Sequence, residues 1–195
     1  MVFSRRVPGQ ATLLFAFEVK RKRGASLKDA ERNLVILKKR VPRLSEAALE
    51  RFVLRARKAV RLQGSVILLV TSSRELQGLN HRFRGKNQAT DVLSFPALRG
   101  SAAGLAGDVA ISAEIAARNA RQLGHTVAEE IEILALHGVL HLAGYDHERD
   151  DGEMAQKEGR LRRALGLPVG LIERSSRKMK KASGRQTRTR VLHGR

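Results

Sequence analysis

Three histidines in the second half of the chain have the spacing of metal ligands. His137 and His141 are four residues apart, so on a helix they lie one turn apart on the same face. Gly144 can adopt the left-handed conformation that ends a helix, which would let the chain turn back and bring His147 towards them. Three imidazoles with no fourth protein ligand nearby leave one coordination position open, as in catalytic zinc sites, whereas structural zinc usually has four protein ligands. A single histidine in an apolar helix is more often an ordinary core residue, but this spacing favours a metal centre.

The segment around these histidines has the pattern of a buried helix. Thr126 and Glu129 form a capping-box pattern at its start. An apolar run follows, consisting of Ile131, Ile133, Leu134, Leu136, Val139, Leu140 and Leu142. A helix from about Val127 to Ala143 would therefore be apolar almost all round, as is typical of a helix inside a domain.

The rest of the central chain predicts short strands and amphipathic helices. The predicted strands are Leu34–Leu37, Val66–Val70, Asp91–Phe95 and Asp108–Ile111. The predicted helix starts are Ser45, Ser72 (with Glu75 as a second capping box), Ser112 and, for the last helix, Asp150 or Asp151. Residues 99–107 are rich in Gly and Ala and predict a flexible loop. The order of elements predicts an α+β fold, a small mixed β-sheet covered by helices, with the histidine helix buried at its centre. This pattern leaves the strand pairing open.

Positive charge is concentrated at the two ends of the chain. The 195 residues carry a formal net charge of +19, of which residues 1–32 contribute +5 and residues 173–195 contribute +8. Such a length predicts one domain with tails. A basic tail is either a disordered, solvated extension or an arm that binds nucleic acid non-specifically, and the composition favours neither.

The composition also bears on the compartment. The chain has no cysteine, which fits a reducing cytoplasm, and no run reaches the ~18 apolar residues of a membrane span. We therefore expect a cytoplasmic protein that does not cross a membrane.

Four motifs, met in order along the chain, resemble those of the YbeY family of bacterial metal-dependent endoribonucleases. The motifs are Leu79–Lys86, Thr90–Pro96, Gly107–Val109 and His137–His147. The resemblance spans roughly residues 33–172 and leaves the two basic ends outside. It implies a zinc-dependent endoribonuclease that cleaves single-stranded RNA and acts in ribosomal RNA processing, including maturation of the 16S rRNA 3′ end, and in ribosome quality control.

The resemblance also assigns residues and partners. It implies one zinc per chain held by His137, His141 and His147, and it gives Arg84 and His137 catalytic roles. The implied partners are RNA and the ribosome or its small-subunit proteins, with no DNA. A guanidinium suits the Arg84 assignment because its planar donors match phosphate oxygens. By their chemistry, imidazoles would also accept nickel or copper. Candidates for orienting the ligands are Asp91, Asp108 and Asp146, each of which is also explained as a cap or turn residue.

Two other functions compete with this interpretation. The histidine spacing also occurs in metzincin metalloproteases, but these place a glutamate directly after the first histidine as general base, where this chain has Gly138. The other alternative is a non-enzymatic factor that binds RNA or the ribosome and whose zinc holds the fold. The basic tails suit that alternative, while the open coordination position argues against it.

Overall fold

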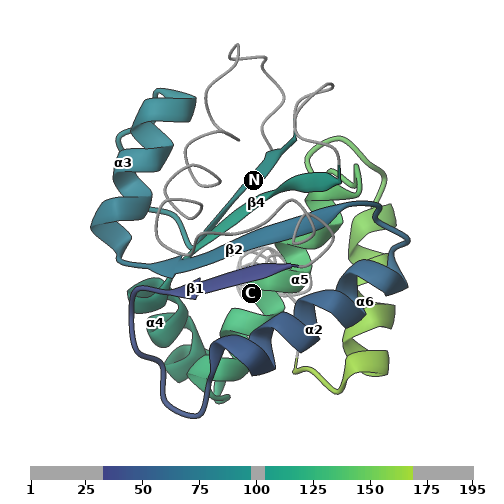
Figure 1. The fold of residues 1–195 in the computed structure, drawn as a ribbon, viewed down its shortest axis with the longest axis horizontal. Helices are drawn as coiled ribbons and strands as arrows, with labels where there is room; N and C mark the ends of the chain where they lie inside the picture. Colours follow the sequence, from purple (N-terminus) through teal and green to yellow (C-terminus); the bar gives the residue numbers. More distant parts are fainter. Residues whose placement is uncertain (1–32, 98–103, 169–195) are drawn as a thin grey trace, which may run out of the picture.

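A four-stranded sheet lies at the centre of the structure, a computed structural model that describes residues 33–97 and 104–168 (Figure 1). Its strands are β1 (Leu34–Leu37), β2 (Ser65–Thr71), β3 (Val92–Pro96) and β4 (Leu105–Ser112). They lie side by side in the order β1-β2-β4-β3, with β1, β2 and β4 parallel and β3 antiparallel to β4. Every residue of β2 is buried, as its apolar sequence predicts for a central strand. The predicted small mixed sheet is confirmed.

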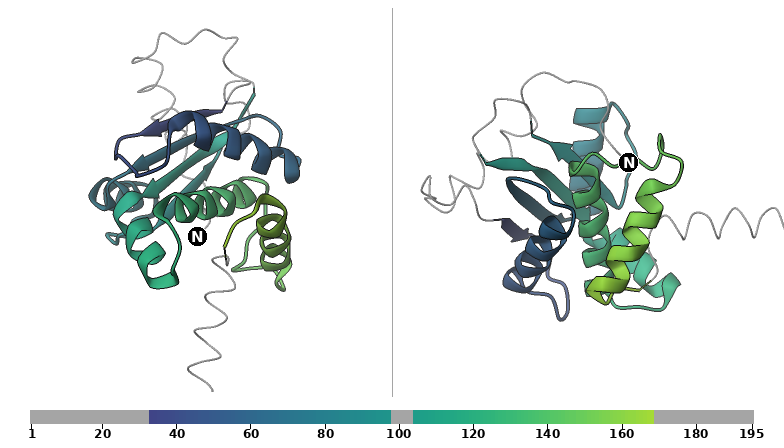
Figure 2. Two further views of the ribbon diagram at one scale, coloured as in Figure 1. Left: turned by 90° about the horizontal axis from the view of Figure 1, so that it is seen from below. Right: turned by 90° about the vertical axis from the view of Figure 1, so that its right-hand side faces the viewer.

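Helices cover both faces of this sheet, as Figures 1 and 2 show. The helices on one face are α2 (Glu46–Ala59), α4 (Ala113–Leu123), α5 (Val127–Leu142) and α6 (Glu153–Leu165). The other face carries α3 (Ser73–Arg84). The element order and the α+β class are as predicted. Within the described ranges, no helix is both long enough and apolar enough to span a membrane. The predicted basic ends, residues 1–32 and 173–195, lie outside the described residues.

The alternation of side chains along β4 separates two apolar cores. Val109 and Ile111 face the larger core, where α5 packs against the sheet. Ala110 faces the smaller core under α3, together with Leu76 and Phe83 of that helix. Because successive side chains of a strand point to opposite faces, position 108 also lies on the α3 face.

The predicted helix starts are largely confirmed. Ser45, Ser72, Ser112 and Thr126 each accept a hydrogen bond from the backbone N–H three residues further on. The capping box of Thr126 is complete. The predicted box at Ser72 is only half formed, because the carboxylate of Glu75 accepts instead from the Thr71 hydroxyl and from Lys38 Nζ at 2.6 Å.

Two boundaries differ from the sequence prediction. The predicted loop at 99–107 is wrong for its last residues, since β4 begins at Leu105. A glycine is needed within that strand, because a Cβ at Gly107 would overlap the Phe95 carbonyl oxygen and lie 2.7 Å from the Leu142 side chain. At the start of α6, Gly152 is the capping residue, and Asp150 supports it by accepting from the N–H groups of Gly152 (2.9 Å) and Met154 (3.0 Å).

Candidate metal centre

The helix α5 is buried along most of its length, which explains its apolar sequence. Its buried residues include Ile131, Leu134, Ala135, Leu136, Val139 and Leu140, all fully enclosed in the larger core. His137 and His141 lie on this buried helix and are only 3% and 2% exposed. Burial of this kind fixes the backbone that carries both imidazoles, because the apolar packing on all sides resists movement of the helix.

A glycine lets α5 approach the sheet beside the histidines. A Cβ at Gly138 would lie 2.6 Å from Val109 Cγ1 of β4 and 3.1 Å from Ser94 Oγ of β3. Any side chain at this position would therefore force the helix away from the sheet. The glycine that separates this motif from the metzincin pattern thus has a packing role.

The turn after α5 brings the third histidine to the other two. Gly144 has a left-handed backbone with φ 93°, as predicted, and the N–H of Tyr145 donates back to the Leu140 carbonyl at 3.1 Å. His147 then follows, with its ring centroid 5.2 Å from the centroids of both His137 and His141. One potential ligand atom from each of the three residues lies within 4.8 Å of the others. The predicted convergence of the three imidazoles is confirmed as geometry.

Two of the three rings are held by hydrogen bonds on the side away from the centre. His137 Nδ1 lies 3.0 Å from Glu158 Oε2 of α6, and His141 Nδ1 lies 2.8 Å from the Tyr145 carbonyl oxygen. Each Nδ1 therefore donates its proton outwards, so that Nε2 carries the lone pair. The two Nε2 atoms lie 2.9 Å apart and face the shared centre.

The surroundings of His141 favour its neutral imidazole, which is the form that binds a metal. Burial lowers the pKa of His141, and the neighbouring His137 lowers it further, to about 2. His147 Nδ1 is buried and has no hydrogen-bond partner among the described residues. A buried His147 nitrogen without a partner, next to two imidazoles whose Nδ1 atoms are already hydrogen-bonded, fits a metal ion, which would accept the lone pair of one nitrogen from each ring.

The partners that orient these ligands differ from those suggested by sequence. Asp91 accepts from the Val92 N–H at 3.0 Å and Asp146 from the Glu148 N–H at 3.1 Å, so both stabilise turns. Asp108 lies on the α3 face of the sheet, opposite to α5; burial raises the pKa of its carboxyl well above the usual range. The orienting groups are Glu158 and the Tyr145 carbonyl. Sequence reasoning missed Glu158, although a carboxylate on the apolar side of the last helix is the signal that would have found it.

Arg84 is the last residue of α3, and that helix packs on the opposite face of the sheet from α5. Its backbone leads into Gly85, which ends the helix with φ 67°. Arg84 Nη1 is buried without a hydrogen-bond partner among the described residues. The structure brings the three histidines together, whereas Arg84 comes from a helix that packs on the other face of the sheet.

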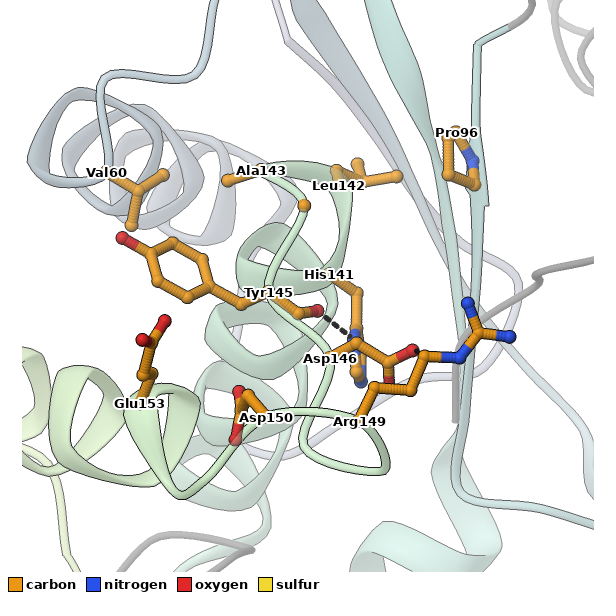
Figure 3. Close-up of a pocket in the computed structure, with 11 residues that line it drawn as sticks. Val60, Pro96, His141, Leu142, Ala143, Tyr145, Asp146, Arg149, Asp150 and Glu153 are labelled. Atoms are coloured by element: carbon orange, nitrogen blue, oxygen red, sulfur yellow. Dashed lines mark hydrogen bonds and ion pairs between the residues drawn. The ribbon is translucent and has the colours of Figure 1, made fainter.

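A cavity of about 650 Å³ opens beside the centre (Figure 3). It lies between the end of α2, the turn after α5 and the start of α6, and His141 forms part of its wall. Its apolar side includes Val60, Pro96 and Leu142, and its polar side includes Asp146, Asp150 and Glu153. Space for a ligand of nucleotide size thus adjoins one of the three imidazoles.

Three converging imidazoles, of which His141 borders a cavity, form a candidate metal centre of the open kind that metal-dependent hydrolases use. The profile of the family described as endoribonuclease YbeY matches residues 27–166 of this chain, and the chain belongs to that family. The resemblance inferred from the four sequence motifs is confirmed, and with it the prediction of an RNA-cleaving hydrolase.

Individual relatives agree with this assignment. The protein named endoribonuclease YbeY in Koribacter versatilis is 56% identical over 155 residues, which are 80% of this chain and 100% of that protein. The protein of the same name in Solibacter usitatus is 53% identical over 131 residues, 67% of this chain and 86% of that protein. A solution structure of a Thermotoga maritima protein aligns with 65% of this chain and 84% of its own, at 29% identity and a TM-score of 0.45.

Proposed function

We propose that this protein is a zinc-dependent endoribonuclease that cleaves single-stranded RNA in the cytoplasm. We further propose that it acts in ribosomal RNA processing, including maturation of the 16S rRNA 3′ end, and in ribosome quality control. Its proposed partners are the ribosome or its small-subunit proteins. DNA is not a proposed substrate. The observation that carries the proposal is the convergence of three imidazoles, two of them buried, with ligand atoms within 4.8 Å of one another beside a cavity. Membership of the YbeY family supports RNA as the substrate.

In this proposal His137, His141 and His147 hold one zinc per chain. Zinc suits three neutral imidazoles, and when bound it supplies a Lewis acid and lowers the pKa of a coordinated water towards ~7. Glu158 and the Tyr145 carbonyl keep the His137 and His141 rings in the orientation that binding requires. His137 lies on α5 directly before Gly138, where the helix contacts the sheet, and its Nδ1 lies within hydrogen-bond distance of Glu158 on α6.

Arg84 is the residue that we propose to stabilise negative charge on the phosphate during cleavage. Phosphodiester hydrolysis increases negative charge on the phosphate oxygens, and a guanidinium stabilises such charge with donors of matching geometry. Arg84 Nη1 makes no hydrogen bond with any described residue, so within these residues its donors are not committed to another acceptor.

The protease alternative is disfavoured by packing as well as by sequence. A metzincin needs a carboxylate base directly after its first histidine. At Gly138 even a Cβ would lie 2.6 Å from Val109 Cγ1, so this backbone has no room for a glutamate. A protease of this type would require a different contact between helix and sheet.

A metal-removal experiment distinguishes the enzyme from a binding factor with structural zinc. The apolar packing of α5 predicts that the protein stays folded after chelation, while cleavage of single-stranded RNA stops. The experiment follows circular dichroism and cleavage of single-stranded RNA, duplex RNA and an unfolded protein substrate, with and without chelator. Loss of the folded spectrum together with the zinc would instead support the structural role, and cleavage of the protein substrate would support the protease.

A further inference from the structure

We propose that the cavity beside His141 is a base-binding subsite that selects guanine in the single-stranded RNA substrate. This inference rests on the proposed function, because a base subsite has a purpose only if RNA is cut at the adjacent centre. It goes beyond that function by assigning a sequence preference to side chains that are not metal ligands. The subsite combines an aromatic ring, a carboxylate without a partner and an apolar wall, and each part has a separate structural basis.

The aromatic ring of the subsite is fixed next to a metal ligand. Tyr145 is the only tyrosine of a chain that has no tryptophan. Its carbonyl oxygen accepts the hydrogen bond from His141 Nδ1 at 2.8 Å, while its ring lines the cavity near Val60 (Figure 3). Proteins that bind single-stranded RNA commonly stack unpaired bases on such rings. A base on Tyr145 would therefore place its nucleotide directly beside the histidine centre.

One of the three carboxylates in the cavity wall has no partner among the residues that the structure describes. Asp150 accepts from the N–H groups of Gly152 and Met154, and Asp146 accepts from a backbone N–H and lies 3.5 Å from Arg149 Nε. Both groups, and Arg149 with them, are thus engaged within the turn. Glu153 is exposed, and its side chain makes no hydrogen bond or ion pair with any described residue. Figure 3 shows its carboxylate pointing towards the ring of Tyr145.

The chemistry of a carboxylate beside a stacked base favours guanine. A carboxylate offers two acceptor oxygens, and guanine presents two adjacent donors, N1–H and N2–H₂, on its Watson–Crick edge. Adenine and cytosine present one amino group next to an acceptor nitrogen, and uracil presents one N–H between two carbonyl oxygens, so each would bring an acceptor against the carboxylate. A good bidentate pair discriminates between bases by roughly 5- to 150-fold.

The walls of the cavity also decide which end of a nucleotide enters. The volume of about 650 Å³ is within the range of sites for small molecules and is sufficient for a base with its ribose. Val60, Pro96 and Leu142 provide apolar surface for the faces of the base. Three carboxylates, Asp146, Asp150 and Glu153, outnumber the one cation of the wall, Arg149, so the wall disfavours a phosphate. We therefore expect the base to enter the cavity and the phosphate to stay on the histidine side.

The test compares two RNA decamers of uridine that carry either one guanosine or one adenosine at the centre. We expect the zinc-loaded protein to cut next to the guanosine at least ~10-fold faster than next to the adenosine. Glu153→Gln should reduce this preference to within about 2-fold at unchanged zinc content, because an amide no longer offers two acceptors. Asp151→Asn, an exposed neighbour outside the cavity, is the matched control and should keep the preference. Tyr145→Leu should weaken binding of both decamers by roughly 5- to 150-fold, far more than Tyr145→Phe does.

Two outcomes would overturn the subsite. One is equal cutting of the two decamers by the unchanged protein, and the other is full guanosine preference in Glu153→Gln. Binding of the decamers, followed by fluorescence anisotropy on zinc-loaded and chelated protein, separates this failure from failure of the nuclease. Selective binding of the guanosine decamer without cleavage contradicts the nuclease alone, whereas cleavage without selectivity contradicts the subsite alone.

Discussion

Removing the Glu158 carboxylate should weaken zinc binding, although Glu158 is not one of the proposed ligands. Its Oε2 lies 3.0 Å from His137 Nδ1, and the two side chains are only 2% and 4% exposed, so water cannot replace the lost acceptor. Loss of such a partner typically lowers metal affinity ~10–100-fold, or about 1.4–2.7 kcal/mol. Glu158→Ala removes the acceptor of His137 Nδ1 altogether and should fall near the upper end. Glu158→Gln keeps a neutral acceptor and should fall near the lower end.

The assay is a competition titration of zinc against a chelating dye. Glu148→Gln is the matched control, because Glu148 is an exposed acidic residue next to His147 whose side chain makes no contact with the ligands. Thermal unfolding of the zinc-free variants establishes that each is folded. Zinc dissociation constants that stay within about 2-fold of the unchanged protein in both folded Glu158 variants would refute the reasoning.

Three further predictions address the ligands, the guanidinium and the helix–sheet contact. The double variant His141→Ala, His147→Ala should lose stoichiometric zinc, and full occupancy by metal analysis would exclude this ligand set. Arg84→Ala should slow RNA cleavage ~100–1,000-fold at normal zinc content, with partial recovery in Arg84→Lys; a folded, zinc-loaded Arg84→Ala that cuts at the normal rate would contradict the nuclease mechanism. Gly138→Ala should lower the unfolding free energy by about 1–3 kcal/mol, and the higher helix propensity of alanine should offset up to ~1 kcal/mol of this loss. Adding Val109→Ala should relieve part of the loss. If the changes in unfolding free energy of the two single variants simply add up in the double variant, as measured by denaturant titration, the contact is contradicted.

The local features of the sequence predicted most of the elements and the histidine cluster. Thr126, Glu129 and the apolar run after them define α5 within a residue of its observed ends, because caps and periodicity act over a few residues. Gly144 ends the helix for a similarly local reason. The histidine cluster could be found from sequence because two of its members share a helix face and the third follows a single turn.

The features that sequence could not supply depend on long-range contacts. The strand order β1-β2-β4-β3 follows from pairings between segments far apart in the chain, and no spacing encodes it. Glu158 is 21 residues from His137, and only the docking of α6 reveals their contact. The suggested role of Asp108 failed because strand alternation does not say which face of the sheet carries α5.

With the proposed ligands, the hydrogen bond between Glu158 and His137 makes the last helix part of the zinc-binding equilibrium. The helix α6 contributes none of the proposed ligands, yet its Glu158 holds the ring of His137, which is one of them. If docking of α6 raises zinc affinity by ~10–100-fold, zinc must raise the stability of the docked helix by the same factor, because such coupling is reciprocal. Zinc supply would then set how firmly α6 is attached to the rest of the fold, and amide hydrogen exchange in α6 would slow as zinc binds. A chain truncated after Asp151 would keep all three histidines and still bind zinc poorly.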